Sequence, residues 1–98
     1  MNILENISFS TDKANVYHIS KSDKIKSFAV GLGAGGVLKK HSTHFPATLI
    51  VLKGEINFVF EDREFVLREF DTFKIPVDEV HEVVGVLDQN LFLLTLEL

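Results

Sequence analysis

The sequence predicts an all-β protein built as an antiparallel sandwich or barrel. Eight or more short stretches rich in β-branched and aromatic residues recur along the 98 residues. Turn-forming residues separate them at intervals of about eight to twelve positions, a spacing typical of antiparallel folds. No helical period follows residue 14. Only Ile3, Leu4 and Ile7 lie at helical spacing, which predicts one short N-terminal helical turn.

The strands are justified in chain order by apolar runs that end at polar or glycine-containing turns. The expected ranges are 14–20, 25–32, 49–52, 56–60, 65–67, 72–75, 80–87 and 91–98. Lys53-Gly54-Glu55 separates two of these runs and predicts an antiparallel hairpin. Glu61-Asp62-Arg63-Glu64 predicts a further turn, where the charges are expected to be solvated. The stretch between Gly35 and Pro46 is interpreted as a polar loop.

Composition excludes several classes of function. Ten basic and fourteen acidic residues are mixed along the chain and give a formal net charge of −4, so no basic surface for nucleic acid and no polybasic membrane anchor is expected. The absence of cysteine excludes disulfides, thiolate catalysis and cysteine-ligated zinc. The N-terminus lacks the features of a signal peptide, and no apolar run approaches the ~20 residues of a membrane span. A single cytoplasmic domain over residues 1–98 is expected.

Gly31 to Gly36 match the dinucleotide-binding pattern G-x-G-x-x-G. That motif needs a helix N-terminus directed at the pyrophosphate. Pro46 and a β-branched strand follow instead, so the glycines are interpreted as a sharp bend or a close backbone approach.

Three histidines are the candidates for chemistry. His41 and His44 precede one expected strand, and His81 opens another, so the two strand ends can meet at one end of a barrel. Converging imidazoles are common ligands of zinc, manganese and iron. The alternative is that each histidine is a hydrogen-bonded polar residue at a strand end. Asp78, Glu79 and Glu82 around His81 also leave an acid–base pair open, with Glu82 expected to face away because strand neighbours point to opposite faces.

The spacing of these residues resembles the cupin family of small jelly-roll barrels. The first cupin motif places a glycine, two histidines, a glutamate and a glycine where this sequence has Gly35, His41, Thr43, Ala47 and Gly54. The second motif places a glycine, a proline, a glycine, a histidine and an asparagine where Phe70, Pro76, Asp78, His81 and Gly85 stand. The resemblance implies an antiparallel jelly-roll β-barrel that covers most of the chain.

The resemblance implies a metal site whose ligands are only partly present. Metal-binding cupins use both histidines and the glutamate of the first motif and the histidine of the second, whereas Thr43 and Ala47 replace two of these four here. If Pro46 disturbs the strand alternation, His41, His44 and His81 form a different three-histidine site. A neutral ligand set favours zinc or nickel over iron or manganese.

Two functions are therefore expected. The first is a cupin-like protein without a robust catalytic centre, which binds a small molecule at the barrel mouth near His41, Thr43, Ala47 and His81. Ala47, Leu49 and Val51 on the inner face predict a dry, apolar interior for it. The alternative is a metal-dependent cupin enzyme, of the oxygenase or isomerase type, that uses the three-histidine site.

A homodimer is also expected, because the last strand is apolar on both faces and small cupins commonly pair through their sheets. The core covers one face, and a second subunit is predicted to cover the other. Sedimentation at micromolar protein concentration tests this: a species of twice the chain mass is expected, and a monomer contradicts it.

Overall fold

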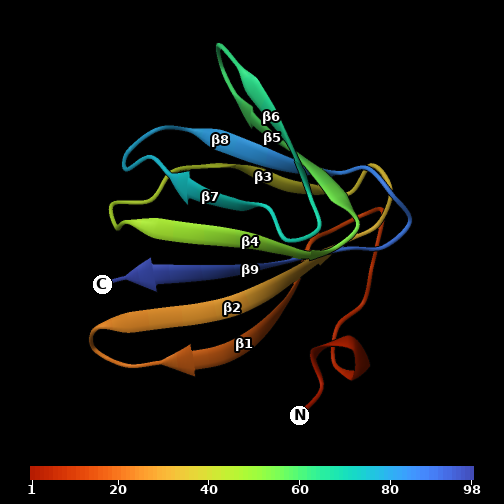
Figure 1. The fold of residues 1–98 in the computed structure, drawn as a ribbon, viewed down its shortest axis with the longest axis horizontal. Coiled ribbons are helices and arrows are strands. Elements are labelled where there is room, and N and C mark those ends of the chain that lie inside the picture. Colours follow the sequence, from red (N-terminus) through yellow and green to blue (C-terminus); the bar gives the residue numbers. More distant parts are fainter.

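Residues 1–98 form two antiparallel sheets in the computed structural model (Figure 1). The five-stranded sheet has the order β1 (Asn15–Lys21), β2 (Ile25–Leu32), β9 (Asn90–Glu97), β4 (Ala47–Lys53) and β7 (Thr72–Ile75). The four-stranded sheet has the order β3 (Val37–His41), β8 (His81–Gly85), β5 (Glu55–Phe60) and β6 (Glu64–Arg68). The all-β, antiparallel prediction is confirmed.

The N-terminal helical turn is present as η1, a 3-10 turn over Ile3–Glu5. The side chain of Asn2 caps it by accepting a hydrogen bond of 2.8 Å from the backbone N–H of Leu4. None of the helical segments of the structure could span a lipid bilayer.

Strand β3 was not predicted, because it lies inside the stretch interpreted as a polar loop. It is an edge strand that pairs only with β8, and its last three residues, Lys39, Lys40 and His41, are exposed. An edge strand of this kind needs no apolar alternation, and charged residues on it oppose pairing with other chains. Its sequence therefore carries little strand signal.

The hairpin predicted at Lys53-Gly54-Glu55 is wrong. Strand β4 pairs with β7 and β9, whereas β5 pairs with β6 and β8, so the chain passes from one sheet to the other at Gly54. Gly54 has φ +80°, and a Cβ there would lie 2.3 Å from the carbonyl oxygen of Gln89. The glycine is required by this close crossing rather than by a hairpin turn.

The inner faces of the two sheets form one apolar core. Strand β5 alternates buried Ile56, Phe58 and Phe60 with half-buried residues, as the period-two pattern predicted. Ala47, Leu49 and Val51 are also buried in the core, which confirms the predicted apolar inner face of β4. Thirteen buried side chains make up this cluster.

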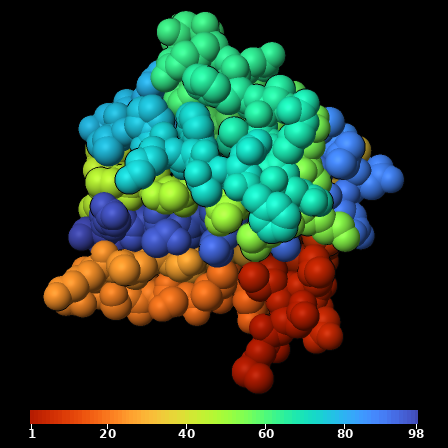
Figure 2. All heavy atoms as spheres, viewed as in Figure 1, coloured from red at the N-terminus to blue at the C-terminus, as the bar shows by residue number.

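Strand β9 is covered on its second face partly by its own chain. Leu91 is buried, although it alternates with Phe92 of the core and so lies on the outer side of the sheet. Ile7 and Ser8 lie against Gly31, the partner of Leu91 on β2. Figure 2 shows the N-terminal segment, in red, at one end of the molecule beside the orange strands. The predicted second subunit is therefore not needed at this end, and the homodimer stays a prediction.

Four backbone positions adopt positive φ angles, and all four are glycine positions of the cupin motifs. Gly35 and Gly54 have φ of 73° and 80°, and the non-glycine residues Phe70 and Asp78 have 69° and 61°. Aspartate tolerates this left-handed region, but a bulky aromatic residue there is strained. Phe70 is held there by the Arg68–Asp71 turn, in which the N–H of Asp71 donates to the carbonyl of Arg68. The left-handed conformation is therefore present at Phe70 and Asp78 although neither residue is glycine.

Replacing Phe70 with glycine is expected to stabilise the protein. The side chain is 75% exposed, so little packing is lost, while relief of the left-handed strain is worth about 1 kcal/mol. Chemical denaturation would measure the gain. Phe70→Ala is the control, since alanine keeps the Cβ and gains much less. A Phe70→Gly variant less stable than the Phe70→Ala variant would contradict the strain at this position.

Candidate functional site

One apolar cavity of about 200 Å³ lies between the sheets. It is at the end of the barrel where β3 and β7 finish and where β4 and β8 begin. Its polar lining is confined to four residues at this end, His41, Ser42, Thr43 and His81. The other ten lining residues are apolar and come from both sheets, namely Phe28, Leu38, Ala47, Leu49, Phe58, Ile75, Val83, Phe92, Leu94 and Leu96.

The four residues predicted to bind a ligand all line this cavity. His41, Thr43, Ala47 and His81 come from the end of β3, the following loop and the first positions of β4 and β8. Cross-strand pairing brings His41 and His81 opposite one another. Their ring centroids are 4.5 Å apart in an edge-to-face arrangement. The sequence spacing therefore identified the residues that share this end of the barrel.

Both imidazoles are oriented by backbone carbonyl groups. Nδ1 of His41 lies 2.7 Å from the carbonyl oxygen of Lys39, and Nδ1 of His81 lies 2.9 Å from that of Glu79. A carbonyl oxygen only accepts hydrogen bonds, so each Nδ1 carries the proton. When a ring protonated at Nδ1 is neutral, its Nε2 is an acceptor.

His81 is buried, with 2% of its surface exposed, whereas His41 is exposed at the mouth. The ring of His81 stacks on the ring of Phe58 at a centroid distance of 4.7 Å. Burial lowers the pKa of His81 below its usual 6.5, because desolvation disfavours the charged ring. The carbonyl of Glu79 opposes this effect and the nearby His41 reinforces it. His81 is therefore neutral at pH 7.

His44 lies apart from this pair. Its side chain is 86% exposed and bonds the carboxylate of Asp78 through Nδ1 at 2.5 Å. The backbone N–H of Asp78 also donates to the carbonyl of Thr43 at 2.8 Å. His44 thus joins the loop after β3 to the loop before β8 and does not line the cavity. Asp78 pairs with His44, and Glu79 meets His81 only through its backbone.

The residues present do not fit the metal centre that the cupin motifs imply. Of the four ligand positions, Thr43 uses its hydroxyl to accept a hydrogen bond from the N–H of Phe45, and Ala47 offers no donor. His41 and His81 are the two remaining donors. No group of three or more histidine, cysteine, aspartate or glutamate side chains is placed to hold a metal ion. No chemical step is therefore assigned to a metal.

Sequence reasoning missed one contact at the site. Arg63, in the turn expected to hold only solvated charges, forms two hydrogen bonds with the carboxylate of Glu79. Glu79 lies two residues before His81. The two partners are 16 residues apart and belong to different turns. No local pattern signals such a pair.

No protein-family model matches this sequence, and no curated protein matches it either. Many solved structures do match. An RmlC-like cupin protein from Desulfovibrio desulfuricans is 25% identical, with a TM-score of 0.85 over 99% of this chain and 93% of that one. A cupin superfamily protein from Desulfitobacterium hafniense is 15% identical, with a TM-score of 0.86 over 100% of this chain and 89% of that one. A conserved protein of unknown function from Streptococcus pyogenes is 13% identical, with a TM-score of 0.79 over 99% of this chain and 84% of that one.

The chain therefore has the cupin jelly-roll fold, as the motif spacing implied.

The free energy of unfolding is expected to fall as the pH is lowered below about 6.5. The unfolded chain then protonates His81 at its usual pKa of 6.5, while the folded protein resists protonation because burial lowers that pKa. The stabilisation is fully present above the unfolded pKa and is lost toward acid. Urea denaturation between pH 8 and pH 5.5 measures the slope.

The matched variants are His81→Gln and His41→Gln. The His81→Gln variant should show a much smaller pH dependence of the free energy of unfolding over this range. The His41→Gln variant should keep most of that pH dependence. Equal slopes in the wild type and the His81→Gln variant would contradict the role of burial.

Proposed function

We propose that this protein binds a small, uncharged, single-ring molecule that carries one hydroxyl group, and that it has no robust catalytic centre. The observation that carries the proposal is the apolar cavity whose polar groups gather at one end. Ligand sites in proteins commonly combine an apolar lining with a few polar groups that orient the ligand.

The size of the cavity supports a single ring. An apolar protein cavity of about 150 Å³ accommodates benzene, and this one measures about 200 Å³. The lining includes three aromatic side chains, Phe28, Phe58 and Phe92. A substituted benzene or a saturated ring of similar size therefore fits, whereas a nucleotide or a sugar phosphate does not.

The polar end supports a hydroxyl donor. Both histidines use Nδ1 as a donor to the backbone, so each Nε2 accepts. A ligand hydroxyl can donate to either imidazole, and Ser42 at the mouth adds a second polar group. A carboxylate lacks the proton to donate and would lose its hydration against the apolar lining. Uncharged alcohols and phenols are therefore favoured over acids.

The alternative function, a metal-dependent enzyme using His41, His44 and His81, finds no support in the site geometry. Two of these imidazoles are neighbours, but the third is committed to Asp78 outside the cavity. The proposed hydroxyl-bearing ligand needs only His41 and His81, which do lie together at the cavity.

The probe for this proposal is 4-methylphenol, followed by NMR titration. A buried ring removes roughly 150 Å² of apolar surface from water, worth about 4 kcal/mol, which corresponds to a Kd of about 1 mM. Toluene is expected to bind more weakly because it lacks the hydroxyl, and 4-methylbenzoate should not bind measurably at pH 7.5.

The paired variants Ala47→Leu and Thr48→Leu test where the probe binds. Ala47 is buried in the cavity wall, and Thr48 is the next residue of the same strand on the exposed outer face. The first substitution should abolish binding and the second should leave it unchanged. Absence of 4-methylphenol binding to the wild type, or unchanged binding by the Ala47→Leu variant, would overturn the proposal.

A further inference from the structure

We infer that Arg63 is a positioning residue for the cavity, which fixes the imidazole of His81 through Glu79. This inference rests on the proposed function insofar as it concerns the ligand, and on the geometry of the free protein insofar as it concerns His81. Arg63 does not line the cavity. It acts from the tip of the β5–β6 hairpin.

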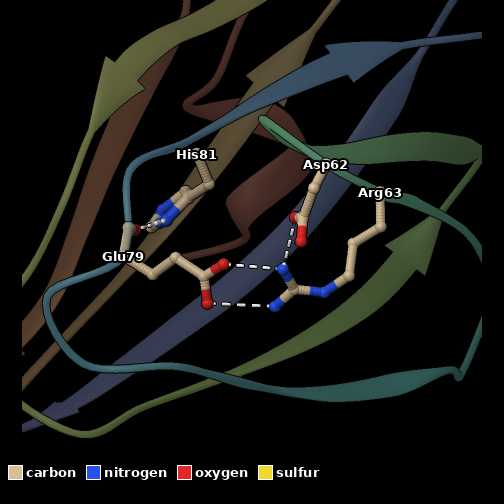
Figure 3. Close-up of polar contacts among 4 residues, drawn as sticks. All are labelled: Asp62, Arg63, Glu79 and His81. Atoms are coloured by element: carbon tan, nitrogen blue, oxygen red, sulfur yellow. Dashed lines mark hydrogen bonds and ion pairs between the residues drawn. The ribbon is translucent and has the colours of Figure 1, made fainter.

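Glu79 is bonded at both ends. Its carboxylate receives two nearly parallel hydrogen bonds from Arg63, with Nη1 to Oε2 at 2.6 Å and Nη2 to Oε1 at 2.9 Å. Its backbone carbonyl accepts the Nδ1–H of His81 at 2.9 Å. Figure 3 shows the guanidinium group facing the carboxylate, with His81 on the backbone side of Glu79. One residue thus links Arg63 to the buried imidazole.

The guanidinium group is itself held from two further sides. Asp62 accepts a hydrogen bond of 2.7 Å from Nη1. The guanidinium carbon lies 4.0 Å from the centroid of the Phe60 ring, within the range of a cation–π contact. Phe60 is the cross-strand partner of His81, and their rings are 6.1 Å apart. Arg63 therefore reaches His81 along two routes, through Glu79 and through Phe60.

This arrangement differs from an ordinary surface ion pair. The side chains of Arg63 and Glu79 are each 38% exposed, and the two bonds fix the carboxylate plane. The other hairpin pair, Arg68 and Glu55, makes one hydrogen bond of 3.1 Å, and the Arg68 side chain is 69% exposed. Exposed single-bond pairs contribute little to stability. Arg68 is therefore a control of the same chemistry on the same hairpin.

The position of the Glu79 carbonyl decides which nitrogen of His81 carries the proton. While the carbonyl accepts from Nδ1, Nε2 remains an acceptor for a ligand hydroxyl. When Arg63 no longer holds the carboxylate, the loop before β8 is still tied at Asp78 to Thr43 and His44, but the carbonyl of Glu79 can move away from Nδ1. The neutral ring then also populates the tautomer protonated at Nε2, which cannot accept the ligand's proton. Arg63 thus keeps Nε2 of His81 available as a hydrogen-bond acceptor.

The experiment compares Arg63→Gln with Arg68→Gln in the full chain. Side-chain ¹⁵N NMR of the ligand-free protein at pH 8 reports the His81 tautomer, and titration with 4-methylphenol reports affinity. The wild type and the Arg68→Gln variant should show the Nδ1–H form. In the Arg63→Gln variant the Nδ1–H form should fall to roughly one fifth of the His81 population, and binding should weaken roughly fivefold, because only that form accepts the ligand's proton. Arg63→Lys should lie between them, because an ammonium group cannot bond both oxygens in the same plane.

The Glu79→Gln variant is an independent test by the same NMR measurements, and it replaces Arg63→Gln if that variant does not fold. It keeps the backbone carbonyl, removes the carboxylate and should give the same tautomer mixture. The Arg63→Gln/Glu79→Gln double variant should show the same tautomer mixture and the same affinity as Arg63→Gln, because both substitutions break the same interaction.

An unchanged His81 tautomer in both single variants overturns the inference, as does an equal change in Arg68→Gln. Affinity in the Arg63→Gln variant within twofold of the wild type overturns the link to the ligand. If the wild type itself does not bind 4-methylphenol, the proposed function fails, and the tautomer comparison in the ligand-free protein still decides the role of Arg63.

Discussion

The buried amide of Asn90 joins the two sheets, and the rest of the barrel is arranged around that junction. The side chain is fully buried, and every hydrogen-bonding position is used. Oδ1 accepts from the N–H groups of Glu55 and Leu87 at 3.0 Å, while Nδ2 donates to the carbonyls of Leu32 and Leu87 at 3.0 and 2.7 Å. A satisfied buried network of this kind is rigid and is costly to break. Gly54 and Gly85 leave it room, because a Cβ at either position would lie within 2.7 Å of the amide.

Closure at the Asn90 end leaves the opposite end as the place where a ligand can enter. There the sheets are separated by apolar side chains and a cavity rather than by a polar junction. The loops at that end are tied to each other at the rim, by His44 with Asp78 and by Arg63 with Glu79. His41, Ser42, Thr43 and His81 are the polar residues among those that line the cavity. The end of the barrel at Asn90 is thus rigid, and the opposite end holds an apolar cavity beside the acceptor Nε2 of His81.

The sequence predicted what depends on local pattern and motif spacing. Alternation identified the inner face of β5, and the spacing of His41 and His81 identified two rings that meet. It did not predict which sheet a strand joins, because Gly54 serves a tight turn and a crossing between sheets equally well by sequence. The Arg63–Glu79 pair could not be predicted either, because its partners meet only in the folded arrangement of β5, β6 and the loop before β8 (Figure 3).

The central claim, that the interior receives a small ring, is tested most directly by intermolecular NOEs between bound 4-methylphenol and methyl groups of the protein. NOEs from the ring protons to Ala47, Leu49 and Val83, all in the cavity wall, are the predicted result. NOEs confined to outer-face methyl groups such as those of Thr48 and Ile50 would contradict the account.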